Sequence, residues 1–262
     1  MTKKQESDIS LVIGDCHTDP SQLQRGGLRR FRWLNNLIKE KRPNRVIIMG
    51  DFTSFTSLSA WDKDKRRKIE GRRYEKDIEV ANKALDLLLD HIPYSQPLQV
   101  EKVFIKGNHE EWLDRYIDID PTFDGLHSVE KDMKLIERGF KVIPYKSDYI
   151  HKGMSFTHVP IMANGKPVGG KYATNKALEV YSNSVCFGHT HNFDVAAVHR
   201  KNSPSLQQAI NCGCFFEHID EYAQGSMTNY WRGVLLLDHY DTNRADIEQF
   251  SMGRLKRMYG GT

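Results

Sequence analysis

Apolar residues in the first half of the chain alternate between short continuous runs and helical spacing. The runs at residues 9–13, 45–49 and 100–105 have the length of buried strands. Between them, apolar residues recur three and four apart over 28–40 and 74–91, which predicts two helices. The order strand, helix, strand, helix, strand is typical of a parallel sheet, and polar residues after such strands gather at one sheet edge.

The second half of the chain has a different pattern. A helix is predicted to begin at Glu110 and another over 128–138. Short strand-like pieces then predict a meander, which a helix near 171–181 interrupts. The predicted strands are 140–143, 149–151, 154–158, 185–187, 193–199, 208–211 and 233–238. No repeat or long linker divides the chain. We therefore predict one α/β domain over residues 1–262, with a basic loop on the substrate side at 52–73 and a flexible basic tail at 254–262.

Composition supports a packed globular protein. Of the 262 residues, 39% are hydrophobic and 27% charged, which excludes the disordered and fibrous classes. The formal net charge of +4 neither requires nor excludes a nucleic-acid partner. Seven basic residues lie close together: Lys63, Lys65, Arg66, Arg67, Lys68, Arg72 and Arg73. They are interpreted either as contacts for substrate phosphates or as a solvated face.

The sequence carries no signal for export or for a membrane span. Its apolar runs are too short to cross a bilayer, and the polar start lacks the apolar segment of a signal peptide. These features predict a cytoplasmic protein without a membrane partner, in the host cytoplasm if the gene is phage-borne. The cysteines are interpreted as reduced thiols. Cys212 and Cys214 could form half of a zinc site, but there is no second cysteine pair to complete it.

Five short polar blocks follow predicted strands and carry the clearest chemical signal. They are Asp15-Cys16-His17, Gly50-Asp51, Gly107-Asn108-His109-Glu110, His158 and Gly188-His189-Thr190-His191. Carboxylate, amide and imidazole groups suit divalent metals such as Mn, Fe, Zn or Ni. Taken alone, Asp15 fits a helix cap and His158 a hydrogen-bonded polar residue. Together, the five blocks favour a metal site.

Spacing and glycine content refine this prediction. Asp15 and His17 are two residues apart, as are His189 and His191. On extended backbone each pair would point to one side and hold a single small site. A glycine precedes four of the blocks, which would let the backbone turn sharply and approach the ions closely.

The order Asp-x-His, Gly-Asp, Gly-Asn-His-Glu, His, Gly-His-x-His resembles the calcineurin-like metallophosphoesterase superfamily, and it spans Asp15 to His191. The stretch 107–116 is most similar to compact phosphoesterases of bacteriophages and bacteria. The resemblance implies the metallo-dependent phosphatase fold, a four-layer α/β/β/α sandwich of two facing mixed sheets flanked by helices. One departure follows Asp51: many members carry a further acid or asparagine shortly after it, where this chain has Phe-Thr-Ser-Phe.

The resemblance also implies residue roles. Seven side chains are assigned to two metal ions: Asp15, His17 and His191 to the first, Asn108, His158 and His189 to the second, and Asp51 to both. His109 would be catalytic, lying over the substrate phosphate without binding metal, and the Asn108 amide would also face the phosphate. Arg115 is interpreted either as a substrate contact or as a surface salt bridge. The other histidines match no block and are interpreted as structural: His91, His127, His151, His199, His218 and His239.

The implied chemistry is hydrolysis of a phosphate ester. Two cations about 3.5 to 4 Å apart lower the pKa of a bridging water and neutralise the phosphate. We therefore predict two divalent ions, with Mn²⁺ preferred and Fe, Zn, Ni or Co as alternatives. The leading hypothesis is a phosphodiesterase that attacks a nucleotide or single-stranded nucleic acid through a metal-bridging hydroxide.

Two other functions stay open. A phosphomonoesterase, such as a protein or nucleotide phosphatase, would use the same ligands. A non-catalytic binding scaffold is the third hypothesis, and the presence of every ligand and of His109 argues against it. A double-strand nuclease is disfavoured because the residues after His191 look fully used by the sheet, which leaves none for a capping domain.

Overall fold

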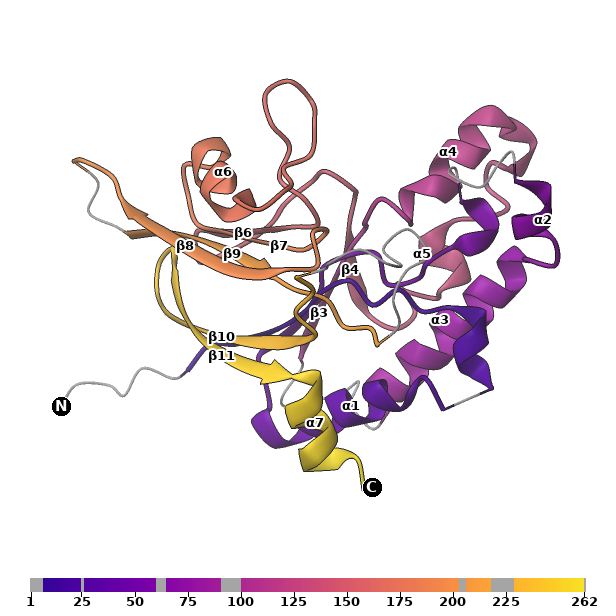
Figure 1. Cartoon of the computed structure of the whole chain (residues 1–262), viewed down its shortest axis with the longest axis horizontal. Coiled ribbons are helices and arrows are strands. Elements are labelled where there is room, and N and C mark those ends of the chain that lie inside the picture. Colours follow the sequence, from indigo (N-terminus) through magenta and orange to yellow (C-terminus); the bar gives the residue numbers. More distant parts are fainter. Residues whose placement is uncertain are drawn as a thin grey trace.

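The computed structural model describes residues 7–24, 26–59, 65–90, 100–202, 206–217 and 229–261, and its strands form two sheets (Figure 1). The first sheet has the order β11-β10-β1-β2-β3-β4. Its strands are β1 (Ile9–Ile13), β2 (Arg45–Ile48), β3 (Glu101–Ile105), β4 (Phe140–Ile143), β10 (Gly233–Asp241) and β11 (Arg244–Ser251). Strands β1 to β4 are parallel, which confirms the prediction for the first half, whereas β10 and β11 join as an antiparallel pair.

The second sheet has the order β5-β6-β7-β9-β8. Its strands are β5 (Tyr149–His151), β6 (Met154–Thr157), β7 (Val185–Phe187), β8 (Phe193–His199) and β9 (Leu206–Cys212). The predicted meander is wrong here, because β6, β7 and β9 pair in parallel. The helix α6 (Ala173–Val180) makes the crossover between β6 and β7 that a parallel pair requires.

Helices cover the outer faces of both sheets (Figure 1). The longest are α1 (Arg29–Lys41) and α3 (Tyr74–Leu89), whose apolar stripes pack on the first sheet. Shorter helices are α2 (Arg66–Ile69), α4 (Glu111–Ile119), α5 (Val129–Asp132) and the 3₁₀ turns η1 (Pro20–Leu23), η2 (Thr56–Leu58) and η3 (Pro121–Phe123). The predicted helix over 128–138 is limited to α5, and turns follow it.

Three apolar clusters define the layers. One lies between the first sheet and its helices, a second between the two sheets, and a third between the second sheet and α6. In the second cluster, Val12 and Ile47 of the first sheet face Phe156 and Ile210 of the other, and all four are fully buried. This arrangement is the predicted sandwich of two facing mixed sheets with flanking helices.

The predicted flexible tail is wrong for most of its length. Residues Met252–Tyr259 form the helix α7, which packs beside α1. Leu255 is fully buried, and the Tyr259 hydroxyl donates a hydrogen bond to Glu40 at 2.7 Å. The sequence pattern missed both β11 and α7, since alternation in β11 is interrupted by charges and the basic residues of α7 hide a narrow apolar stripe. Among the described helices, none is both long and apolar enough to cross a bilayer.

Candidate metal centre

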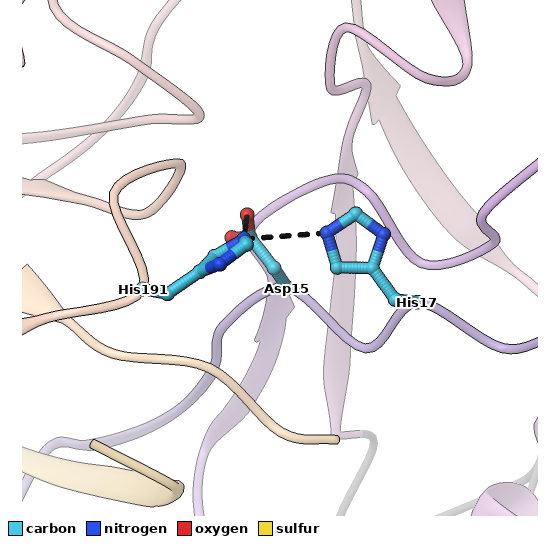
Figure 2. Close-up of side chains that lie close together, drawn as sticks. All are labelled: Asp15, His17 and His191. Carbon is cyan, nitrogen blue, oxygen red and sulfur yellow. Dashed lines mark hydrogen bonds and ion pairs between the residues drawn. The ribbon is translucent and has the colours of Figure 1, made fainter. Parts of the chain in front are cut away.

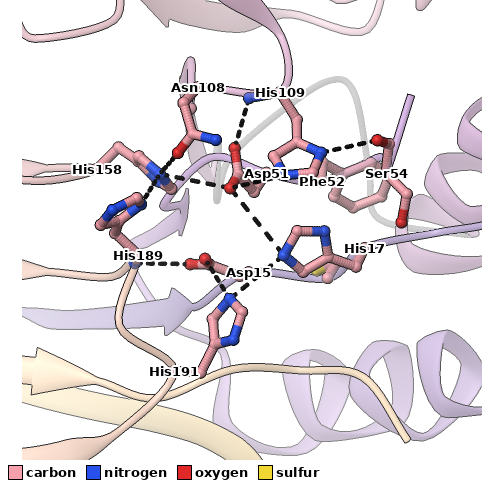
Figure 3. Close-up of polar contacts among 12 residues, drawn as sticks. Asp15, His17, Asp51, Phe52, Ser54, Asn108, His109, His158, His189 and His191 are labelled. Atoms are coloured by element: carbon pink, nitrogen blue, oxygen red, sulfur yellow. Dashed lines mark hydrogen bonds and ion pairs between the residues drawn. The ribbon is translucent and has the colours of Figure 1, made fainter. Parts of the chain in front are cut away.

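All seven predicted ligands lie together at the ends of strands. Asp15 and His17 follow β1, Asp51 follows β2, Asn108 follows β3, His158 follows β6, and the two remaining histidines follow β7. Figure 3 shows the side chains of all seven converging, with His109 beside them. The parallel strands deliver them to the same edge because their carboxyl ends coincide there.

The first donor set consists of Asp15, His17 and His191, drawn in Figure 2. Nε2 of His191 lies 3.0 Å from Oδ2 of Asp15 and 3.3 Å from Nε2 of His17. The three residues are almost completely buried. One carboxylate and two imidazoles therefore face a common point.

The second donor set consists of His158, His189 and Asn108 together with Asp51. Nε2 of His158 lies 3.1 Å from Oδ1 of Asn108 and 3.2 Å from Nδ1 of His189. Nδ1 of His158 lies 2.8 Å from the Met49 carbonyl oxygen. Since a carbonyl can only accept, Nδ1 carries the hydrogen and the lone pair of Nε2 faces the site.

Asp51 lies between the two sets. Its Oδ2 is 3.5 Å from Nε2 of His158 and 4.0 Å from Nε2 of His17. Its Oδ1 accepts a hydrogen bond from the His109 backbone N–H at 2.9 Å, which fixes the orientation of the carboxylate. The Asp51 side chain is 3% exposed, so the carboxylate is shielded from bulk water.

The backbone at the centre is strained. His17, Asp51, His189 and His191 all have positive φ, between 43° and 68°. Side chains other than glycine rarely adopt this region, and such strain concentrates at functional sites. The extended backbone expected at the pairs Asp15/His17 and His189/His191 is therefore wrong. Asp15 and His17 still share a donor set, whereas His189 and His191 lie in different sets.

Two glycines permit the close approach of the loops. A Cβ on Gly107 would lie 2.1 Å from Oδ1 of Asp51, and one on Gly188 would lie 2.6 Å from Oδ1 of Asp15. Both distances are far below a van der Waals contact. Any other residue at either position would displace a carboxylate of the centre.

Electrostatics favour the metal-binding forms of Asp15 and His189. Burial raises the pKa of Asp15, but the nearby His191 and His158 together outweigh burial, so the net pKa is lowered. Burial, together with the nearby His158, lowers the pKa of His189 to about 4, so that His189 is neutral at pH 7. Anionic carboxylates and a neutral imidazole are the forms that bind metal.

The donor set fits divalent metal ions. Nε2 of His17 faces Nε2 of His191 at 3.3 Å, and Nδ1 of His189 faces Nε2 of His158 at 3.2 Å. In each pair only one nitrogen can donate a hydrogen. A bound cation would use the lone pairs of both. Two buried carboxylates beside four imidazoles also offer the charge and the mixed oxygen and nitrogen ligands that borderline metals take.

His109 borders the centre with a defined proton position. Its Nδ1 lies 2.7 Å from the Ser54 carbonyl oxygen, so Nδ1 donates, and Nε2 points to within 3.8 Å of Oδ2 of Asp51. Its ring packs against Trp112 at a centroid distance of 4.0 Å. Ser54 belongs to the segment after Asp51 that departs from the superfamily pattern. In this segment the main-chain carbonyl of Ser54 accepts the hydrogen bond from His109.

Glu110 also supports the centre, a role that the sequence pattern does not reveal. Its fully buried carboxylate accepts backbone hydrogen bonds from Gly107 at 2.8 Å and from Asp51 and Phe52 at 2.9 Å. These donors favour the ionised form, while burial and the Asp51 carboxylate raise the pKa of Glu110 to about 7. Glu110 thus connects the loop after β2 to the loop after β3.

We expect Glu110→Ala to lower the free energy of unfolding by roughly 3 kcal/mol or more, because it leaves three buried N–H groups without an acceptor. Urea denaturation of metal-free protein would measure this change. Glu111→Ala, at the adjacent and partly exposed position, is the matched control. A Glu110→Ala protein as stable as the control would show that the carboxylate does not brace the loops.

Other elements support the centre from outside the predicted blocks. The fully buried Arg30 of α1 donates to the carbonyl oxygens of Cys16 at 3.1 Å and Phe215 at 2.9 Å. Phe216 packs edge-on against His17 and His191. No local motif marks Arg30 or Phe216, because both act through partners distant in sequence.

The cysteines, the other histidines and the basic residues lie outside the donor clusters or outside the described residues. The four cysteines are free and buried, and none of the described donor clusters contains one. Of the other histidines, 91 and 218 lie outside the described residues, and the described four belong to none of the donor clusters. Arg115 is exposed on α4. Of the basic stretch, Lys63 and the side chains of Arg66 and Lys68 lie outside the described part.

The fold and the donor cluster together define a metallo-dependent phosphatase architecture. The sequence profile of the calcineurin-like phosphoesterases matches residues 10–193, more than two thirds of the chain, so the chain belongs to this family. Its members are generally phosphoesterase hydrolases that use divalent metals. The profile covers every predicted ligand.

Comparisons with individual proteins show a more distant likeness. No curated protein matches the chain in sequence. Among solved structures, the chain is similar to Vps29 of Entamoeba histolytica complexed with Zn²⁺, at 12% identity and a TM-score of 0.39, covering 93% of this chain and 99% of that one. It is also similar to Vps29 of Chaetomium thermophilum, at 11% identity and a TM-score of 0.40, covering 93% and 97%.

Proposed function

We propose that this chain is a phosphodiesterase that holds two divalent metal ions and hydrolyses a nucleotide or nucleic-acid phosphodiester. The observation that carries the proposal is the position of Asp51, whose Oδ2 lies within 4.0 Å of both donor sets. One ion would be held by Asp15, His17 and His191, and the other by Asn108, His158 and His189, with Asp51 shared. Mn²⁺ is the preferred ion.

When bound, the two ions would neutralise the phosphate and activate water as the nucleophile. The protein supplies the remaining parts. His109 presents Nε2 beside Asp51, where it can donate a proton to the leaving oxygen, and its hydrogen bond to Ser54 keeps the ring in this orientation. Glu110 holds the two loops in register through backbone hydrogen bonds.

The preference for a diester comes from basic residues near the loop after β2. Arg72 donates to the Thr56 carbonyl oxygen at 3.1 Å, two residues beyond Ser54. Arg72, Arg73 and Lys76 line a cavity of about 400 Å³ between η1, η2 and α3. Acidic residues share its walls: Asp19, Glu70 and Asp77. The cavity is thus mixed in charge, and its cations are suited to a second phosphate of a longer substrate.

A comparison of substrates tests the proposal. Protein stripped with EDTA and reloaded with Mn²⁺ is assayed on bis(4-nitrophenyl) phosphate, 4-nitrophenyl phosphate and single-stranded DNA, with Asp15→Ala as the blank. We expect metal-dependent turnover with a higher kcat/KM for the diesters. Faster monoester hydrolysis would instead identify a phosphomonoesterase, and no turnover with Mn²⁺, Fe²⁺, Zn²⁺, Ni²⁺ or Co²⁺ would favour a binding scaffold.

A further inference from the structure

Two tyrosines outside the predicted blocks border the two donor sets. The Tyr145 ring lies 6.0 Å from the ring of His158, in the second set. The Tyr230 ring lies 4.7 Å from the ring of His191, in the first set. Both tyrosines are partly exposed, unlike the fully buried Phe216 beside them. Each donor set therefore has a tyrosine ring at its border.

Each tyrosine is accompanied by positive charge. Nζ of Lys146 lies 5.4 Å from the centroid of Tyr145, and Cζ of Arg232 lies 5.8 Å from that of Tyr230. We call these groups the tyrosine–cation pairs: Tyr145 with Lys146, and Tyr230 with Arg232.

We propose that the tyrosine–cation pairs bind the two nucleosides on either side of a phosphodiester, so that the ligand class is single-stranded nucleic acid. Aromatic rings that stack bases, next to cations that contact the backbone, are the general means of binding single strands. A phosphomonoester has an organic group on only one side of its phosphate and would leave one pair unused. This inference rests on the proposed function and names its substrate class.

Binding to metal-free protein tests the inference without relying on turnover. The fluorescence anisotropy of a labelled oligothymidylate would give Kd in EDTA at fixed salt. We expect Tyr145→Leu and Tyr230→Leu each to raise Kd roughly tenfold, because each removes a stacking surface. Tyr145→Phe and Tyr230→Phe should stay within about twofold of the parent. Lys146→Ala and Arg232→Ala should each reduce the slope of log Kd against log salt concentration by about 1, which corresponds to the loss of one phosphate contact.

The matched control is Tyr240→Leu, at a tyrosine that is 44% exposed on β10, away from the donor sets. The inference is overturned if oligothymidylate does not bind, if the two leucine variants bind as tightly as the parent, or if the control weakens binding equally. Turnover of bis(4-nitrophenyl) phosphate with Mn²⁺ is measured in parallel. Absent turnover with tyrosine-dependent binding would refute the proposed hydrolysis alone, whereas normal turnover with tyrosine-independent binding would refute this inference alone.

Discussion

Asp51→Asn is expected to weaken both metal ions together, because one carboxylate oxygen lies within 4.0 Å of donors from both sets. The asparagine side chain has the same shape and keeps an oxygen for the His109 N–H, so the loop should fold as before. It lacks the negative charge that offsets two neighbouring cations. Since loss of a residue that only supports a ligand costs about 10- to 100-fold in metal affinity, loss of the shared ligand should cost at least 100-fold.

Metal content by atomic emission and titration calorimetry with Mn²⁺ would measure this effect. Asp8→Asn is the matched control, because Asp8 pairs with His151 and Lys152 beyond the opposite end of β1 and contacts no donor of the centre. The control should bind two ions with the affinity of the parent. An Asp51→Asn protein that loses one ion and keeps the other at full affinity would show that Asp51 belongs to a single metal.

His109→Ala is expected to remove most turnover while leaving metal content nearly intact. Nδ1 of His109 donates to the Ser54 carbonyl oxygen, and Nε2 lies 3.8 Å from Oδ2 of Asp51, but His109 is assigned to neither of the two ions. A positioned acid or base contributes about 10²- to 10⁴-fold to a rate. We therefore expect kcat to fall by that factor, with a smaller change in KM.

Steady-state kinetics on a diester, together with metal analysis of the same samples, separates the two roles. His127→Ala is the matched control, since His127 is an exposed histidine that pairs with Asp132 outside the centre. His109 also shares a possible donor cluster with His17 and Asp51. A variant that loses an ion would therefore identify His109 as a ligand, and one with parental kcat would remove it from catalysis.

Much of the fold was predictable because local pattern and local structure coincide. The runs that form β1, β3 and β4 and the stripes that form α1 and α3 were found within one or two residues of their bounds. Buried parallel strands are continuously apolar, and helices on a sheet carry a stripe, so both signals are strong. The strand pairing of the second sheet was harder to predict. Its strands β5 and β7 have three residues each, which is too short to reveal how they pair.

The sequence also predicted which residues converge. The spacing of these residues did not decide how they divide between the two donor sets. Five polar blocks that follow strands, in one order, indicate a metal centre from the sequence alone. The two-residue spacing suggested that His189 and His191 share one site, yet the left-handed backbone at both residues separates them. The family resemblance assigns His189 and His191 to different ions, and their side chains lie in different donor clusters.

The sequence alone determined the types of ligand and the sheet edge at which they meet, since both follow from residue chemistry and strand order. Only the tertiary structure decided the contacts among them. His17 and His191 are 174 residues apart, and Glu110 supports Asp51 from 59 residues away. Such contacts depend on how two sheets and their loops pack in space, and local periodicity along the chain carries no record of that packing.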